Sequence, residues 1–231
     1  MFAEILILNK MHLLEVIGNR KIEINYDGVT VSLLIEKIIY SILVSGPYQN
    51  ATNYFYIIHN SNDFYFNDLE DVNYELDELS LSKINAFLEN FETGKYGIYK
   101  LSGNLDIIES VNNNVSHLYL SYENNRIIIQ TNSTSNLNKD KVNIYKNKIL
   151  SGKSPIIFIY SKPYYGAELE HIFFIIHGNE ILKAYRDLNL EPKFIAIVNY
   201  TEFDYDKPNQ SVVKIISSYK EIRETSYKYF Y

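Results

Sequence analysis

Apolar and polar residues alternate along several short segments of the chain, and this period of two is typical of half-buried β-strands. Residues 2–8 and 21–26 show the alternation, and the second of these segments runs into the turn pair Asp27-Gly28. Further strands are predicted at residues 53–59, 64–66, 96–101, 155–161, 168–177, 181–185, 193–200 and 211–219. Residues 117–122 and 126–131 predict a hairpin around Asn124-Asn125.

Two segments instead place apolar residues three or four positions apart, which is the spacing of one helix face. Residues 31–44 carry Ile35, Ile38 and Ile42 at this spacing and end before Gly46-Pro47, so a helix in the core is expected there. Residues 80–92 predict a second amphipathic helix, with Ser80 as its N-cap and Gly94 as its stop. A short helix is expected at residues 104–111, followed later by a polar segment at 133–150.

The order of these elements favours an α+β fold with a mainly antiparallel sheet or sheets and two principal helices in the N-terminal half. We expect residues 1–231 to form a single domain. Within it, an α/β subregion at 1–101 and a β-rich part at 102–231 are distinguished by the predicted elements.

Composition narrows the class of protein. Of the 231 residues, 46% are hydrophobic and 22% are charged, as in an ordinary globular chain. The net charge of −6 speaks against a protein that wraps nucleic acid. The start of the chain carries charges and no long apolar run follows, so we expect a soluble, cytoplasmic protein without a membrane segment. The 32 Ile, 26 Asn and 22 Tyr against 4 Arg indicate an AT-rich genome.

Metal chemistry finds little support in the sequence. The chain has no Cys, so disulfides and thiolate sites are excluded, and no metal is expected. The 5 His never stand four residues apart on a predicted helix. The acidic stretch at residues 68–78 is interpreted as a solvated loop, with a cation site as the alternative.

A pair of carboxylates is the sharpest chemical feature. Glu168 and Glu170 stand two residues apart, so in a strand both side chains leave the same face about 7 Å apart. Paired carboxylates suit acid–base chemistry on a sugar or nucleotide. The alternative is that both residues line the solvent face of an edge strand, where their charges keep the edge from pairing with another strand.

Three short motifs occur in a specific order. The predicted helix at 80–92 is followed by Gly97-Ile98-Tyr99-Lys100, then by Ser133-Thr134-Ser135, and then by an aromatic segment leading into Glu168-Leu169-Glu170. Over residues 79–205 this order resembles the mono-ADP-ribosyltransferases of the bacterial exoenzyme and phage type.

The resemblance implies roles for these residues. NAD would be the cosubstrate, held by Lys100, Thr134 and Ser135, while Glu170 stabilises an oxocarbenium-like state and Ser133 orients Glu170. Glu168 would take the proton from the acceptor, which the first Glu of the motif implies to be arginine on a protein substrate. Lys100 stands where the family has arginine, and lysine lacks the bidentate fork, so a degenerate member without activity is the alternative.

Two other functions remain open at this point. The predicted order β-α-β-β-α-β over residues 3–101 is that of a ferredoxin-like, RNA-associated subunit. The 22 Tyr favour a non-catalytic protein that binds a protein partner, such as a virus-encoded, mobile-element or toxin-neutralising factor. In that interpretation the aromatic cluster at Tyr227, Tyr229, Phe230 and Tyr231 is a candidate contact surface.

Overall fold

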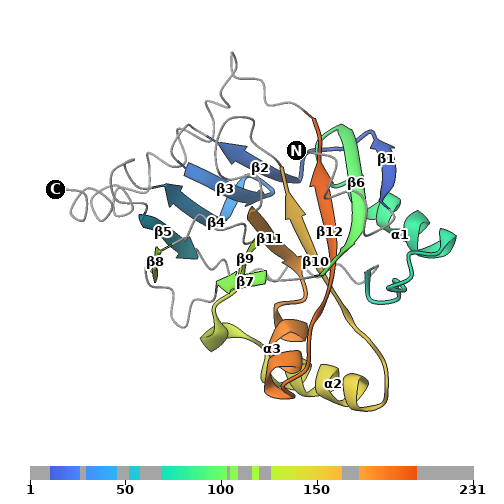
Figure 1. Ribbon diagram of the computed structural model, residues 1–231. Helices are drawn as coiled ribbons and strands as arrows, with labels where there is room; N and C mark the ends of the chain where they lie inside the picture. Colours follow the sequence, from blue (N-terminus) through green and yellow to red (C-terminus); the bar gives the residue numbers. More distant parts are fainter. Residues whose placement is uncertain are drawn as a thin grey trace.

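The computed structural model describes residues 11–26, 30–45, 52–57, 69–102, 105–108, 116–119, 126–162 and 172–201. They form two β-sheets and three α-helices (Figure 1). The larger sheet has seven strands in the order β1 (His12–Val16), β6 (Gly94–Leu101), β12 (Lys193–Asn199), β10 (Ile156–Ser161), β11 (Ile172–His177), β9 (Arg126–Ile129) and β7 (Leu105–Ile108). The smaller has five, β2 (Ile22–Tyr26), β3 (Thr30–Ile35), β4 (Ile38–Ser45), β5 (Thr52–Ile57) and β8 (Ser116–Tyr119). The helices are α1 (Glu78–Leu88), α2 (Lys139–Leu150) and α3 (Asn179–Asp187).

The larger sheet mixes strand directions. The pairs β10–β12, β9–β11 and β7–β9 are parallel, whereas β1–β6, β6–β12 and β10–β11 are antiparallel. The smaller sheet is antiparallel between all its neighbours. The predicted mixture of helices and strands is therefore confirmed, but the mainly antiparallel arrangement holds only for the smaller sheet.

The predicted core helix at residues 31–44 is wrong, because this segment is the β3–β4 hairpin. The turn residues Glu36 and Lys37 have φ angles of 50° and 66°, the left-handed pair of a tight two-residue hairpin turn. Ile35 pairs directly with Ile38 across the turn. Apolar residues line this segment almost continuously, so their spacing fits a helix and two strands equally well, and β-branched residues favour the strands. The ferredoxin-like order is lost with this helix.

Helix placement differs elsewhere too. Among the described residues of the N-terminal half, α1 is the only helix. It begins at Glu78 because Asp77, not Ser80, is its N-cap and accepts a hydrogen bond from the Ser80 backbone N at 2.8 Å. Helix α2 lies in the polar segment at residues 133–150, for which no helix was predicted, and the Asn138 side chain caps it. The described part of the N-terminal half therefore holds one of the two expected helices.

Three local predictions are also wrong. The helix expected at 104–111 is strand β7, which pairs in parallel with β9. The hairpin expected at 117–131 does not form, since β8 pairs with β5 in the smaller sheet and β9 with β7 and β11 in the larger one. The strand expected at 181–185 is part of α3, whose buried residues Ile181, Leu182 and Tyr185 share one face. Gly178, at a φ of 105°, ends β11 and begins this helix.

Strands β2, β5, β6, β10 and β12 confirm five predicted strands with small shifts of their ends. Strand β11 confirms the second half of the strand expected at 168–177. The strands predicted at 2–8, 64–66 and 211–219, and the aromatic cluster at 227–231, lie outside the described residues.

Two apolar clusters lie on opposite faces of the larger sheet. Helices α2 and α3 cover one face, where Val142, Ile149 and Leu182 pack with residues of β10, β11 and β12. Helix α1 and the smaller sheet cover the other face (Figure 1). Because both faces are covered, all six residues of β10 are buried, as expected for a central strand.

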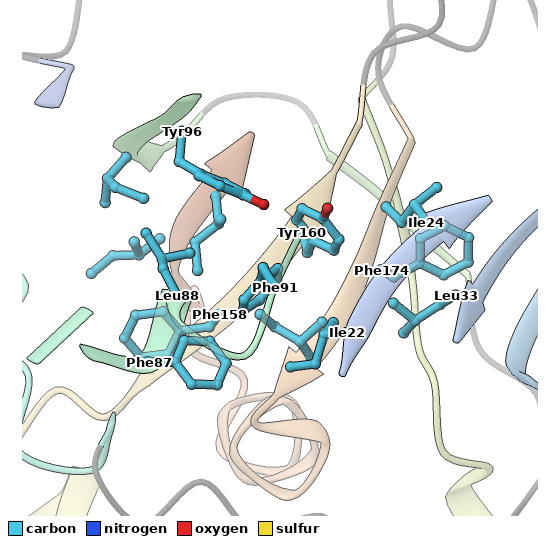
Figure 2. Close-up of a cluster of buried hydrophobic side chains, with 14 of the residues drawn as sticks. Ile22, Ile24, Leu33, Phe87, Leu88, Phe91, Tyr96, Phe158, Tyr160 and Phe174 are labelled. Atoms are coloured by element: carbon cyan, nitrogen blue, oxygen red, sulfur yellow. The ribbon is translucent and has the colours of Figure 1, made fainter. Parts of the chain in front are cut away.

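Phe91 lies at the centre of the second cluster, between the two sheets (Figure 2). Its ring meets Phe87, Tyr96 and Tyr160 edge to face, with centroids 5.2, 5.9 and 4.8 Å apart. The backbone at Phe91 also forms a parallel bridge with Ile22 of β2, and Ile22 N donates to Asn90 O at 2.8 Å. This bridge ties the smaller sheet to the segment that links α1 and β6.

Within the described ranges, no helix has both the length and the apolar character that crossing a bilayer requires.

Candidate functional site

The predicted cofactor residue Lys100 lies on β6 and already has a partner. Its Nζ is 2.6 Å from Glu75 Oε2 and 4.8 Å from the centre of the Tyr74 ring. The side chain is 26% exposed, so the pair sits at the surface of the sheet. Lys100 therefore holds the turn before α1 against β6, a structural contact that a bound phosphate would have to replace.

The Ser-Thr-Ser motif follows β9 and forms the short 3-10 helix Thr134–Asn136, with Ser133 as its N-cap. Ser133 is fully buried, and its Oγ lies 3.1 Å from Ser135 Oγ. Thr134 Oγ1 is buried without a hydrogen-bond partner among the described residues. The hydroxyls of Ser133 and Ser135 are thus in contact just after β9, and Thr134 lies between these two residues in the chain.

The described residues do not bring Lys100 and Ser133 together. Strands β6 and β9 are separated by β12, β10 and β11, which corresponds to roughly 19 Å across the sheet. Ser133 also lies beyond the C-terminal end of β9, whereas Ile172, where the chain enters the parallel strand β11, lies at the other end. Glu168 and Glu170 lie outside the described residues.

A buried polar network occupies a different place, where β10 and β12 end. Glu92 lies between α1 and β6, Lys162 follows β10 directly, and Asn199 is the last residue of β12. Lys162 Nζ and Asn199 Nδ2 both donate to Glu92 Oε1, each at 2.6 Å. The Lys162 and Glu92 side chains are only 6% and 14% exposed, so this is a largely desolvated ion pair.

Two tyrosine hydroxyls complete the network. Tyr96 OH donates to the Glu92 backbone carbonyl at 2.5 Å, and Asn199 Nδ2 lies 3.3 Å from Tyr96 OH and 3.5 Å from Tyr160 OH. Both hydroxyls lie at the same end of the aromatic cluster (Figure 2). Burial raises the pKa of Tyr96 and of Tyr160 well above the ordinary value, so both stay protonated. The network therefore holds one carboxylate among neutral hydroxyls.

Glu92 is held asymmetrically. Both side-chain donors meet Oε1, and from the described residues no hydrogen bond reaches Oε2. The side chain keeps 14% exposure. A carboxylate that is fixed through one oxygen is suited to stabilise a cation or to accept a proton on the other.

The network lies at the end of the sheet where ligands commonly bind. Strands β10 and β12 are parallel neighbours, and both their carboxyl ends carry a network residue. In open α/β sheets, ligands bind outside the carboxyl ends of parallel strands. Because β10 and β11 are antiparallel neighbours, the chain between Ser161 and Ile172 also leaves and re-enters the sheet at this end.

A second carboxylate stands beside this network. An isolated parallel bridge between Ile22 and Phe91 brings together the backbones that lead into Glu23 and Glu92, and the charge of Glu92 acts on Glu23. Burial raises the pKa of Glu23, and the charge of Glu92 raises it further, while Arg20, Lys162 and Lys37 oppose the shift. Glu23 thus holds a proton more readily than an ordinary glutamate does.

Sequence reasoning missed Glu92, Glu23, Lys162 and Asn199. A weak signal exists for two of them, because Lys162 and Asn199 are polar residues that directly end buried apolar runs. Glu92 was predicted at the end of a helix and Glu23 on a half-buried strand, and neither prediction indicates that the two residues lie near each other. Their proximity depends on a contact between the two sheets.

In the described part of the chain, no three His, Asp or Glu side chains come together as metal ligands. The acidic stretch before α1 instead forms ion pairs, between Glu70 and Lys148, Asp71 and Lys83, and Glu75 and Lys100. These ion pairs account for three carboxylates of the acidic stretch.

At the C-terminal end of β11, burial lowers the pKa of His177 to about 4.

Comparison of the chain with protein-family models, with curated proteins and with solved structures finds no match.

Proposed function

We propose that the protein is an enzyme that cleaves the glycosidic bond of a nucleotide, with the Glu92 network as its centre. The observation that carries the proposal is the asymmetric environment of Glu92, whose Oε1 is fixed by Lys162 and Asn199 while no described residue donates a hydrogen bond to Oε2. Glycosidic cleavage passes through an oxocarbenium-like state, and a fixed carboxylate lowers the energy of that state.

NAD is the first substrate to test, because the sequence resembles ADP-ribosyltransferases. In this proposal Glu92 faces the developing cation, and Lys162 and Asn199 keep its carboxylate in place. Glu170 and Glu168 keep the roles that the resemblance implies. Lys100, Ser133, Thr134 and Ser135 lie away from this centre and act, if they contact NAD, at its distant end.

The experiment is turnover of NAD by the full-length protein, followed as release of nicotinamide with and without an arginine-bearing acceptor. Glu92→Gln keeps the shape of the side chain and removes its charge, so we expect kcat to fall at least 100-fold. Glu89→Gln is the matched control, because Glu89 is an exposed residue three positions earlier on the same segment. Calorimetry with NAD separates a loss of binding from a loss of the chemical step.

The family motif is tested in parallel. Glu170→Gln is expected to abolish hydrolysis and transfer alike, whereas Glu168→Gln should impair transfer more than hydrolysis, because only the acceptor loses a proton to Glu168. A protein that neither binds NAD nor releases nicotinamide, or a Glu92→Gln variant as active as Glu89→Gln, contradicts the proposal.

A non-catalytic protein that binds a partner is the second candidate. It is favoured by two exposed apolar side chains at the edge of the larger sheet, Leu13 at 67% and Ile17 at 88% exposure. Strand β1 is the last strand on that side of the sheet in the described part of the chain. One stoichiometric protein partner that a Leu13→Ser/Ile17→Ser variant no longer retains, together with the lack of any NAD turnover, would favour this function.

A further inference from the structure

We propose that Glu23 is the proton donor that acts with Glu92, and that the site therefore takes purine nucleosides or nucleotides, whose base must be protonated as it leaves. The inference rests on the proposed glycosidic cleavage and names a second catalytic residue and a substrate class for it.

The first support is the placement of the two carboxylates. Glu23 comes from β2 of the smaller sheet and Glu92 from the segment before β6. The parallel bridge between Ile22 and Phe91, together with the hydrogen bond from Ile22 N to Asn90 O at 2.8 Å, fixes the register of the two backbones. Backbones joined by such a bridge lie about 4.8 Å apart, and the charge of Glu92 acts on the Glu23 carboxyl group, so the two groups lie within electrostatic reach of each other.

The second support is the different surroundings of the two groups. Glu92 accepts two hydrogen bonds of 2.6 Å, one of them from the cationic side chain of Lys162. Glu23 is desolvated and faces the Glu92 charge, so its protonated form is favoured. The cations that face Glu23 are Arg20, Lys37 and Lys162, and Lys162 is already paired with Glu92. One protonated and one ionised carboxyl group are the arrangement that glycosidic cleavage uses.

The step balances with water as the only co-reactant. The bond between C1′ of the ribose and the purine nitrogen breaks, and its electron pair goes to that nitrogen as the base takes the proton of Glu23. The Glu92 carboxylate stabilises the cationic ribose, and water adds to C1′ and gives up a proton to Glu92. Proton transfer through solvent from Glu92 to Glu23 restores the starting state.

NAD provides an internal comparison, since its nicotinamide leaves as a neutral ring and needs no proton. We therefore expect Glu23→Gln to lower kcat/KM for adenosine monophosphate about 100-fold more than kcat/KM for NAD. Glu15→Gln is the control, because Glu15 is an exposed carboxylate on β1 that pairs only with Lys95 at the surface. The basic limb of the pH profile for adenosine monophosphate should disappear in Glu23→Gln.

Carbon-13 NMR titration of the glutamate carboxyl groups supplies a readout that does not depend on turnover. Glu23 should titrate above the ordinary glutamate range, and Glu92→Gln should lower its pKa. Equal losses for the two substrates, or a Glu23 pKa that Glu92→Gln leaves unchanged, would overturn the inference while leaving the proposed function standing. A wild-type protein that turns over neither substrate overturns both.

Discussion

The ion pair between Lys162 and Glu92 gives the sharpest prediction about stability. At 2.6 Å and an effective dielectric constant near 20, the attraction between the two charges is about 6 kcal/mol. Desolvation offsets much of this, because the side chains are only 6% and 14% exposed. Lys162→Met removes the cation and keeps most of the volume, so it leaves Glu92 charged and buried with Asn199 as its remaining side-chain donor.

We expect Lys162→Met to lower the free energy of unfolding by about 3 to 5 kcal/mol at pH 7. The assay is chemical denaturation followed by circular dichroism. Adding Glu92→Gln to this variant should recover most of the loss, since the unpaired charge is then absent. Lys95→Met is the control, because the Lys95–Glu15 pair is 74% and 79% exposed and should contribute about 0 to 1 kcal/mol. Equal losses for Lys162→Met and Lys95→Met would refute the reasoning.

Three further predictions concern other parts of the fold. Glu36→Asn with Lys37→Gly should raise the free energy of unfolding by about 1 kcal/mol, because both turn residues have positive φ angles; a thermal melt lower than that of the wild type would contradict this. Phe91→Ala should lower the free energy of unfolding by about 4 kcal/mol in urea titrations, because the ring is fully buried. Leu79→Ala, at a side chain that is 67% exposed, should change this free energy by less than about 0.5 kcal/mol. His177 has a pKa of about 4 against an ordinary 6.5, so the unfolded chain binds its proton first and stability should fall by about 3 kcal/mol from pH 7 to pH 4. His177→Gln should remove that part of the pH dependence, and an unchanged pH profile of unfolding would exclude His177 as its source.

Much of the strand content follows from sequence because buried strands leave a clear pattern. The run from Ile156 to Tyr160 is hydrophobic, begins after Pro155 and ends at Ser161-Lys162, so β10 was predicted almost to the residue. The segment at 31–44 was not, because Glu36 and Lys37 are unusual residues for a tight turn and carry no signal in place of Asn-Gly. Helix α3 was missed because residues 181–185, which form most of it, also fit a short strand.

The candidate site was harder to predict than the fold. Glu92 and Lys162 are 70 residues apart, and Glu92 and Asn199 are 107 apart. No local pattern relates such positions, since their contact is set by the order of strands in the sheet. Conversely, Lys100 and Ser133 belong to motifs that follow one another along the chain but lie far apart in the sheet. Lys100 is on β6 and Ser133 follows β9, and three strands separate β6 from β9.

The position of β12 in the larger sheet has a consequence for the order of folding. This strand is the last described in the sequence, yet it lies between β6 and β10. Strands β1 and β6 therefore cannot join the group β10–β11–β9 in one sheet until β12 pairs with both β6 and β10. Such late, long-range insertion predicts slow folding and a nascent chain that exposes two incomplete half-sheets during synthesis. Asn199, at the end of β12, would be among the last residues to join the Glu92 network, so the site is assembled only when the sheet closes.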